Sequence, residues 1–292
     1  MDASLGSIVS LEQLIDTDRF PLAEPKRQEY KRSVSEARVS LADQGCAILK
    51  RFIRPDTLRI MSDEIACRKG DTHFSTDCIN PYFHTEVNSD YPARHPVNTF
   101  LERSSGFIPG DAWEANTLNR VLFEHPALGQ FLADCLGLET LYPYADPLAG
   151  LTTNILDPDQ QFTWHFDTNE FAVTILVDAA EDGGLFEYVP GIRSADAECF
   201  NDIQKILDGD RHRVRTLNLE PGDLQIFRGR YSLHRVTRVA PSSRPRHAAI
   251  FAYTEQSGVI GRVERTRQLF GRVLPEHLAA ENQRVRSDAL ID

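Results

Sequence analysis

The sequence predicts an α+β protein that is mainly β, with an antiparallel sandwich or jelly roll between two helical segments. Three observations lead to this fold class. Short β-rich runs fill residues 141–262, turn-forming residues separate these runs, and the segments before and after them repeat their apolar residues at helical spacing. Strands at this spacing, with no helix expected between them, are typical of such sandwiches. We expect residues 1–292 to form a single domain.

The segment 1–140 is expected to be a helical N-terminal part that begins with an arm over residues 1–20. A helix is expected to start at Pro25 and to end at Gly45, because glycine suits the residue that follows a helix. One face of this helix repeats apolar residues at i, i+4, i+7 and i+11, namely Tyr30, Val34, Ala37 and Leu41.

The short apolar run at 46–49 predicts a strand directly after this helix. A second helix is expected from Pro55 to about Gly70, with its inward face made of Leu58, Met61 and Ile65. Residues 114–136 again show helical spacing, and Pro126 is expected to break them into two pieces.

Residues 71–113 show no regular period and contain four prolines among aromatic and histidine side chains. An irregular stretch of this length within a compact domain is either disordered or functional. Because the aromatic side chains favour an ordered segment, we expect a lid loop over the functional site.

The β core is expected to span residues 141–262. Its strands are predicted at 151–156, 171–177, 185–189, 214–219, 224–227 and 248–253. The final segment, 263–292, is expected to return to helix and to dock through Leu269, Leu274 and Leu278.

Charge and composition exclude several classes of function. Asp and Glu number 43 against 32 Lys and Arg, which gives a formal net charge of −11. This balance repels a phosphate backbone, so nucleic acid is not an expected partner. The chain has no run of about 18 apolar residues, so we expect no membrane-spanning helix. The N-terminal residues lack the basic and apolar regions of a secretory signal.

The cysteines predict a cytoplasmic protein with free thiols. They are odd in number, far apart and without a CxxC pair: Cys46, Cys67, Cys78, Cys135 and Cys199. This pattern is typical of a reducing compartment and argues against both a disulfide framework and a cysteine-bound structural zinc.

One short motif indicates a metal site. His165 and Asp167 belong to the string Trp-His-Phe-Asp, which precedes the β-rich run at 171–177. In extended backbone, side chains two residues apart point to the same face. An imidazole and a carboxylate are two of the three ligands of a 2-His-1-carboxylate triad, which leaves coordination positions open on Fe(II). The motif alone is weak, because a second His-x-acid occurs at His84.

Context favours the first motif. His84 lies in the irregular stretch with no strand expected behind it, so we interpret it as a loop residue. A third ligand must come from a later strand of the same core, which leaves His212, His234 and His247. His212 stands among charged residues in a turn, and His247 adjoins an arginine and is more plausibly packed. His234 follows a Pro-Gly-Asp turn and a strand, so it is the preferred third ligand.

These residues together resemble the Fe(II)/2-oxoglutarate-dependent oxygenase superfamily. The resemblance rests on the string HFD, the turn and strand GDLQIF, a distal His and an Arg ten to twelve residues later, over residues 150–255. The longer strings HFDTNEFAVTILVDAAEDGGLFEYVPGIRS and FRGRYSLHRV are similar to a bacterial group of hydroxylases and halogenases that act on free amino acids. The resemblance implies a double-stranded β-helix core, that is, a jelly roll.

The resemblance also implies roles for individual residues. His165, Asp167 and His234 would bind iron, and O2 would bind at the same iron. The distal carboxylate of 2-oxoglutarate would bind Arg246 at the start of the last core strand, with Arg244 as the alternative. The sequence departs from the family at Ala248, where a hydroxyl residue is expected. No catalytic residue is expected beyond the metal ligands.

The resemblance distinguishes two oxidative outcomes. The halogenases of this group replace the carboxylate ligand by a small residue such as glycine, and chloride takes the vacated position. This chain keeps Asp167. We therefore expect hydroxylation of a small amino acid or amine-type metabolite rather than halogenation.

Four residues are weaker candidates for substrate contacts. Thr168 and Asn169 follow the ligand motif, where they could face the substrate or cap the turn into the next strand. Glu187 could pair with a substrate amine or point to solvent by strand alternation. Arg103, in the expected lid, could pair with a substrate carboxylate or be solvated.

Several alternatives stay open at the level of sequence. The same site could perform desaturation, cyclisation or halogenation. A cupin-like metal or ligand binder without oxygenase activity would keep the β core but not bind 2-oxoglutarate. A protein-modifying oxygenase would need a peptide groove, and no sequence feature indicates one. A homodimer is compatible with the sequence but not required by it.

Overall fold

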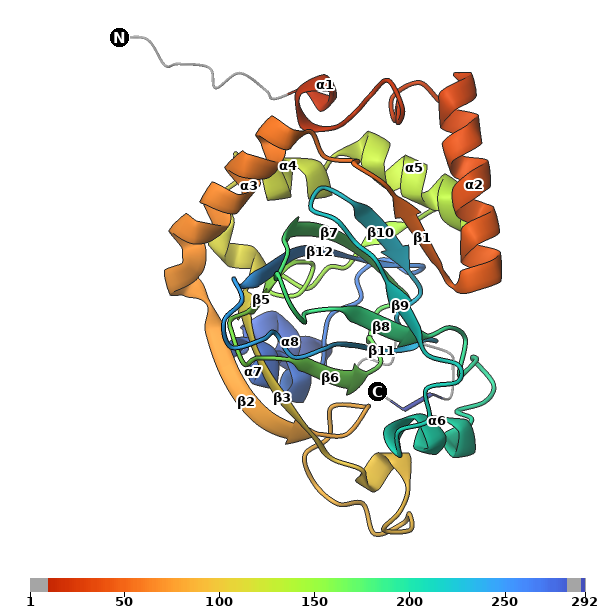
Figure 1. Ribbon diagram of the computed structural model, residues 1–292, viewed down its shortest axis with the longest axis vertical. Helices are drawn as coiled ribbons and strands as arrows, with labels where there is room; N and C mark the ends of the chain where they lie inside the picture. Colours follow the sequence, from red (N-terminus) through yellow and green to blue (C-terminus); the bar gives the residue numbers. More distant parts are fainter. Residues whose placement is uncertain (1–9, 283–289, 292) are drawn as a thin grey trace.

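The computed structural model describes residues 10–282 and 290–291, and its centre is a pair of antiparallel sheets flanked by helices (Figure 1). The larger sheet holds, in spatial order, β1 (Cys46–Leu49), β10 (Leu224–Phe227), β7 (Phe171–Asp178), β12 (Arg246–Thr254), β5 (Leu151–Leu156), β3 (Leu101–Ile108) and β2 (His73–Ile79), with β4 (Tyr142–Pro143) paired to β12. The smaller sheet holds β6 (Phe162–His165), β11 (Leu233–Val236), β8 (Phe186–Val189) and β9 (Arg215–Leu217).

The helices lie around the two sheets as expected from a chain that is helical at both ends. On the side of the larger sheet are α1 (Leu11–Leu14), α2 (Gln28–Gln44), α3 (Pro55–Arg68), α4 (Leu118–Phe123) and α5 (Pro126–Leu136). Beside the smaller sheet lies α6 (Phe200–Leu207), and the chain ends with α7 (Val263–Phe270) and α8 (Pro275–Ala280). Three short 3-10 helices also occur among the described residues, η1 (Lys69–Asp71), η2 (Pro96–Asn98) and η3 (Gly110–Ala112).

Local sequence explains where the N-terminal helices begin and end. Gly45 follows α2 in the left-handed conformation (φ 67°), which glycine adopts without a steric penalty. Pro55 occupies the first turn of α3, where its missing N–H costs no hydrogen bond. Pro126 starts α5 in the same way and so separates it from α4. These boundaries confirm the helices predicted from the sequence to within a few residues.

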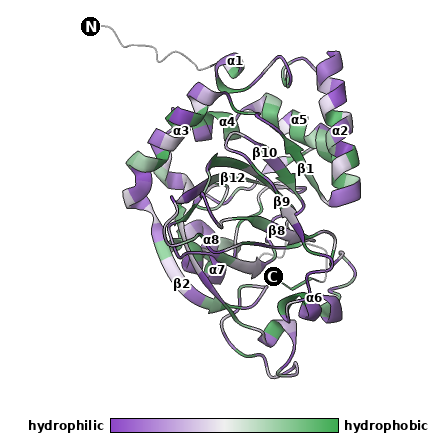
Figure 2. Ribbon diagram, in the orientation of Figure 1, coloured by the Kyte–Doolittle hydropathy of each residue, from purple (hydrophilic) through white to green (hydrophobic). Residues whose placement is uncertain are grey.

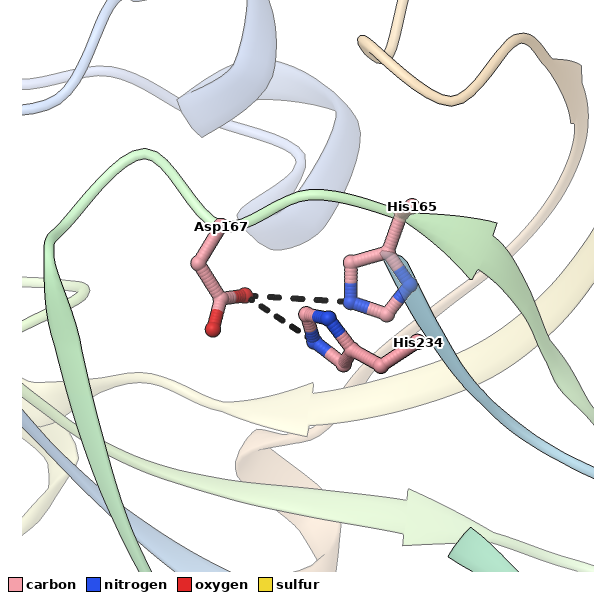
Figure 3. Close-up of side chains that lie close together, drawn as sticks. All are labelled: His165, Asp167 and His234. Atoms are coloured by element: carbon pink, nitrogen blue, oxygen red, sulfur yellow. Dashed lines mark ion pairs between the residues drawn. The ribbon is translucent and has the colours of Figure 1, made fainter. Parts of the chain in front are cut away.

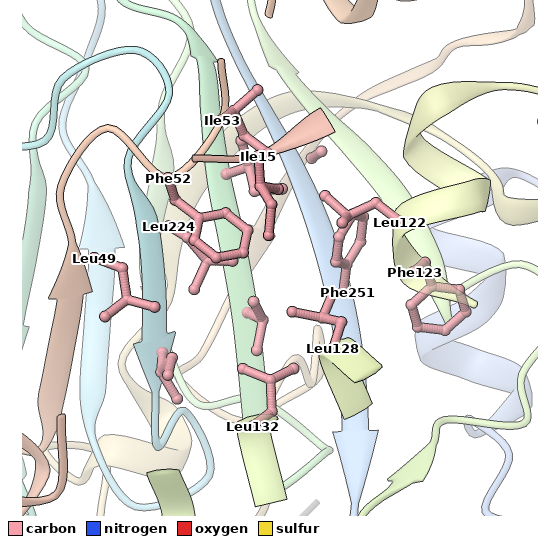
Figure 4. Close-up of a cluster of buried hydrophobic side chains, with 14 of the residues drawn as sticks. Ile15, Leu49, Phe52, Ile53, Leu122, Phe123, Leu128, Leu132, Leu224 and Phe251 are labelled. Carbon is pink, nitrogen blue, oxygen red and sulfur yellow. The ribbon is translucent and has the colours of Figure 1, made fainter. Parts of the chain in front are cut away.

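The main apolar core lies between these helices and the larger sheet. Figure 4 shows side chains from the loop after β1, from α4 and α5 and from strands β10 and β12 packed against one another. Phe52, Leu128, Leu132 and Phe251 are fully buried there. Figure 2 shows hydrophilic residues along the outer sides of α2 and α3, so the helices present apolar faces to the sheet and polar faces outward.

The segment 71–113 is not the irregular loop that its sequence suggests. It contains β2 and β3, which pair over their whole length and extend the larger sheet at its edge. Every second residue of β2 is exposed, namely Phe74, Thr76 and Cys78, and the half-buried residues between them, His73, Ser75 and Asp77, are polar, so the strand gives no apolar pattern. Only the connection 80–100 is irregular, and it contains Pro81, Pro92 and Pro96.

Two further expectations need correction. Helix α6 interrupts the β core, although no helix was expected between the strands. Of the three leucines predicted to dock the C-terminal helices, Leu269 and Leu274 pack against a buried cluster, whereas Leu278 is 59% exposed. The strands predicted at 151–156 and 224–227 match β5 and β10 residue for residue.

The sequence also predicts that no helix spans a membrane and that the cysteines are free. Within the described residues, no helix combines the length and the apolar character that crossing a bilayer requires. All five cysteines are free, as their spacing predicts.

A buried carboxylate ties the C-terminal helices to the core. Asp146, in the turn before β5, accepts backbone N–H groups of Leu148 and Ala149 (both 2.8 Å) on Oδ1 and of Gly261 (2.9 Å) on Oδ2. His277 of α8 lies 3.2 Å from both oxygens through Nε2. Because the N–H of Leu274 donates to Nδ1 of this histidine (3.0 Å), Nε2 carries the proton and donates to Asp146.

We therefore expect Asp146→Ala to lower the free energy of unfolding by about 3 kcal/mol or more, because it leaves three buried N–H groups without an acceptor. Asp146→Asn, which keeps one carbonyl oxygen, should cost clearly less. Urea denaturation of the three proteins followed by circular dichroism measures the difference. Equal stability of Asp146→Ala and wild type would contradict the proposed tie.

Candidate active site

Three side chains with metal-binding atoms converge between the two sheets (Figure 3). His165 is the last residue of β6, Asp167 follows it, and His234 lies on β11. Antiparallel pairing places His234 directly opposite His165, although 69 positions separate them in the sequence. The Asp167 Oδ1 atom lies 3.4 Å from Nε2 of His234 and 3.8 Å from Nε2 of His165. One ligand atom from each residue fits within 4.8 Å of the others.

Backbone carbonyls fix the orientation of both imidazoles. Nδ1 of His165 lies 2.7 Å from the carbonyl oxygen of Thr163, and Nδ1 of His234 lies 2.9 Å from that of Ser232. Each carbonyl can only accept, so each Nδ1 carries the proton and donates it. The lone pairs of both Nε2 atoms therefore face Asp167, as metal coordination requires.

Burial and neighbouring charges shift the pKa values of His165 and Asp167 toward the forms that bind a cation. Burial, together with the neighbouring His234, lowers the pKa of His165 well below its usual value and favours the neutral imidazole. Burial alone raises the pKa of Asp167, but His234, His165 and Arg265 outweigh it and lower this pKa to about 2. Burial thus favours a neutral His165 and an ionised Asp167, and with the imidazole of His234 they supply the ligand types of a non-haem iron site.

A glycine makes room for the carboxylate. A Cβ atom on Gly229, in the loop between β10 and β11, would lie 1.8 Å from Oδ2 of Asp167. The carbonyl oxygen of Gly229 also accepts the backbone N–H of Asp167 (3.2 Å). Residue 229 therefore has to be glycine for Asp167 to hold its present position.

The side chains of His165, Asp167 and His234 line a cavity between the two sheets, which we call the bore. Every second residue of β12 lines this bore, from Arg246 through Ala248 and Ile250 to Ala252. These positions span about 20 Å of extended strand. Phe and Tyr rings form a large part of the remaining wall, and Thr152, Asn154 and Thr174 add polar atoms from β5 and β7, the neighbours of β12 in the larger sheet. An apolar bore with few polar groups is typical of a small-molecule site.

Arg246 stands at one end of the bore as a buried cation. Its side chain is almost inaccessible, and none of the residues 10–282 and 290–291 gives it a hydrogen bond or an ion pair. Burial lowers the pKa of Arg246 to about 10. A buried guanidinium without a partner is costly, so the structure suits an anionic group that enters the bore and binds Arg246.

The other arginine considered from the sequence lies outside the bore. Arg244 is exposed, and its side chain donates to Oε1 of Glu181 (2.6 Å). It already has a carboxylate partner, so it is not placed to bind a ligand of the bore.

The substrate candidates divide into two pairs. Thr168 and Asn169 line the bore, and Asn169 also donates from Nδ2 to the carbonyl oxygen of Phe171 (2.5 Å), as a turn-capping residue does. Glu187 faces away from the bore, where it pairs with Arg211 and with Arg235. Its neighbours Phe186 and Tyr188 point to the opposite side, as strand alternation dictates.

Arg103 is also not at the site. It is fully buried on β3 and binds Asp77 of β2 (2.5 Å) and the hydroxyl of Ser105 (2.9 Å). The substrate roles expected of Glu187 and Arg103 are therefore wrong: both side chains are engaged in ion pairs between neighbouring elements.

Sequence reasoning missed three residues that shape the site: Phe83, Gly229 and Arg265. Phe83 and Arg265 line the bore, and Gly229 shapes the metal cluster. Their positions depend on tertiary contacts, and only Gly229 has a sequence signal, since it lies five residues before His234 in the loop that leads to this strand.

Comparison with known proteins agrees with this geometry. The model of the Halogenase D family (HalD) matches residues 111–266, which is more than half of the chain. The chain belongs to the Halogenase D family. This membership confirms the resemblance to the Fe(II)/2-oxoglutarate-dependent oxygenase superfamily. No curated protein sequence matches the chain.

Solved structures show the same fold as this member of the Halogenase D family. AviO1 from Streptomyces viridochromogenes Tue57 has a TM-score of 0.51 at 15% identity and covers 78% of this chain and 96% of its own. A prolyl hydroxylase from Trichoplax adhaerens, in complex with a hypoxia inducible factor peptide fragment, has a TM-score of 0.51 at 12% identity, with coverage of 80% and 96%. The α-ketoglutarate-dependent epimerase SnoN scores 0.50 at 11% identity, with coverage of 77% and 81%. These similarities confirm the jelly-roll core.

The fit between Gly229 and Asp167 predicts a weaker metal site in Gly229→Ala. The added methyl group displaces the carboxylate, so we expect the affinity for Mn(II) or Co(II) to fall about tenfold or more. Isothermal titration of the metal-free protein measures this affinity. Gly129→Ala, on α5 with no atom near the new methyl group, is the matched control and should bind metal like wild type. Unchanged affinity in Gly229→Ala would count against Asp167 as a ligand.

Proposed function

We propose that this protein is a non-haem Fe(II)- and 2-oxoglutarate-dependent dioxygenase that hydroxylates an unactivated C–H bond of a small amino acid or amine-type metabolite, with succinate and CO2 as co-products. The observation that carries the proposal is the combination, in one bore, of the His165, Asp167 and His234 cluster with the buried and unpartnered Arg246. Family membership and fold support the same chemistry.

The ligand count suits this reaction. Three protein ligands leave three positions of an octahedral Fe(II) open, which is enough for two atoms of 2-oxoglutarate and one O2. When bound, iron with 2-oxoglutarate and O2 supplies the oxidising chemistry, in which the co-substrate loses CO2 and becomes succinate. The cluster residues hold the metal, while the aromatic wall keeps water from the reacting centre.

Arg246 is the residue that we assign to the co-substrate. A dicarboxylate needs a cation at a fixed distance from the metal, and the guanidinium at the far end of β12 offers paired N–H donors for a carboxylate. Because no carboxylate of the described residues pairs with Arg246, binding 2-oxoglutarate would compensate a charge that is buried there.

We expect Arg246→Ala to weaken 2-oxoglutarate binding about thirtyfold or more, since the mutation removes a buried charge partner. Arg244→Ala is the matched control: it lies two residues away, pairs with Glu181 and should leave binding unchanged. The measurement is an anaerobic titration of the Fe(II) protein with 2-oxoglutarate, followed by the metal-to-ligand charge-transfer band. This band should be lost in His165→Ala.

The same titration distinguishes the alternatives. A protein that binds iron but gives no charge-transfer band with 2-oxoglutarate would be a cupin-like metal binder rather than an oxygenase. A band that forms equally in wild type and in Arg246→Ala would show that another residue anchors the co-substrate.

Halogenation is a second candidate function, because the family model that matches the chain is that of a halogenase. The cluster argues against it. Asp167 lies beside both histidines, so its carboxylate would occupy the coordination position that chloride takes in a halogenase without this ligand. Desaturation, epimerisation and cyclisation would use the same ligand set, so these outcomes depend on the substrate rather than on the metal site.

We expect turnover in the presence of excess chloride to give a product heavier by one oxygen atom and free of chlorine. Asp167→Gly should lose this oxygenation and gain chloride binding at the metal, because the mutation vacates one ligand position. Mass spectrometry of the products, after a screen of small amino acids and amines, is the measurement. A chlorinated product from the wild-type protein would contradict hydroxylation and establish the second candidate.

A further inference from the structure

A rigid turn covers the metal cluster from one side. It runs from Asn80 to His84 and is organised by the fully buried side chain of Asn80. The Oδ1 atom of this residue accepts the N–H groups of Tyr82 and His84 (both 2.9 Å), and its Nδ2 donates to the carbonyl oxygen of Val97 (2.6 Å). With all these bonds made inside the protein, the turn has one defined conformation.

The turn places an aromatic ring against a metal ligand. Phe83 is buried and has the left-handed backbone conformation (φ 69°), which is unfavourable for a bulky residue. Its ring packs edge-on against the imidazole of His165, with 5.6 Å between centroids. Gln268 of α7 donates to its carbonyl oxygen (3.1 Å). The surrounding contacts hold a strained residue in place, which is typical of functional sites.

The same ring also contacts a cation. The guanidinium of Arg265, from α7, lies 3.7 Å from the centroid of Phe83. Arg265 also donates to the carbonyl oxygen of Phe166 (2.7 Å) and to the hydroxyl of Thr168, one residue on each side of Asp167. The ring of Phe83 thus contacts both His165 and Arg265, which couples its position to the segment around Asp167.

These residues separate two cavities. The bore lies on one side, and a smaller outer groove lies on the other, lined by the turn, α7 and the residues beside it. Three residues belong to the walls of both: Phe83, Thr168 and Arg265. Phe83 contributes the largest apolar side chain of the three, so its ring is the main part of this partition between bore and groove.

We propose that Phe83 is the specificity-determining residue of this site: its ring closes the bore toward the outer groove and restricts substrates to small molecules held wholly inside the bore. A substrate that extends from the bore into the outer groove would have to pass the Phe83 ring. This proposal rests on the proposed function, because it takes the His165, Asp167 and His234 cluster as the metal centre.

The test uses metal ligands of two sizes and needs no turnover. The Co(II)-substituted protein is titrated with imidazole and with phenylimidazole, and binding is followed by the visible spectrum of cobalt. We expect Phe83→Ala to raise the affinity for phenylimidazole, relative to imidazole, about tenfold, because the missing ring leaves room for the added phenyl group. Phe83→Leu, which refills part of the volume, should give a smaller increase and serves if Phe83→Ala does not fold.

Tyr82→Ala is the matched control. It removes the neighbouring ring of the same turn, which stacks on Phe166 (5.7 Å between centroids) and lines the outer groove but not the bore. Its ratio of affinities should equal that of wild type. If both Phe83 variants keep the wild-type ratio of affinities for phenylimidazole and imidazole, the proposed role of Phe83 is wrong, but the metal site stands. A wild-type protein without a cobalt spectrum overturns the metal site, and the proposal with it.

Discussion

The antiparallel pairing of β6 with β11 is the interaction on which the site depends. It sets His234 opposite His165, and it does so through main-chain hydrogen bonds rather than through the side chains themselves. The two imidazoles then need only their own backbone carbonyls to point both Nε2 atoms toward Asp167. A shift of one residue in this register would turn His234 to the other face of the sheet. The helices and the larger sheet hold this pair of strands in place.

Within residues 10–282 and 290–291, the buried charged side chains of Glu187, Arg103 and Asp146 have partners. Glu187 and Arg103 pair with residues of neighbouring elements, and Asp146 is saturated by hydrogen-bond donors. Arg246 lies in the bore and has neither a hydrogen bond nor an ion pair with any of these described residues. Since an unpaired buried charge destabilises a fold, its presence in the bore indicates that this cavity is adapted to bind a ligand rather than to stabilise the fold.

Sequence patterns predicted the cluster of His165, Asp167 and His234 but only part of its surroundings. The ligands lie next to local signals, namely an alternating strand end at His165 and a turn and strand before His234. Glu187 looks the same in sequence whether it faces a bore or a distant arginine, because the arginines that pair with it come from other parts of the chain. The edge strand β2 escaped notice for a related reason: an exposed strand carries polar residues and gives no apolar period. Phe83 acquires its role only through contacts with α7.

The order of the chain along the sheets has a consequence for biosynthesis. Strand β1, near the N-terminus, completes its pairing only with β10, and the clamp on the metal-binding segment comes from α7, after the last strand. Synthesis runs from the N-terminus, so β1 and the strand that carries His165 must wait for partners made later. Contacts this distant in sequence make folding slow. A chain truncated shortly before α7 would keep His165, Asp167 and His234 but would lack the contacts of Arg265 with Phe166 and Thr168.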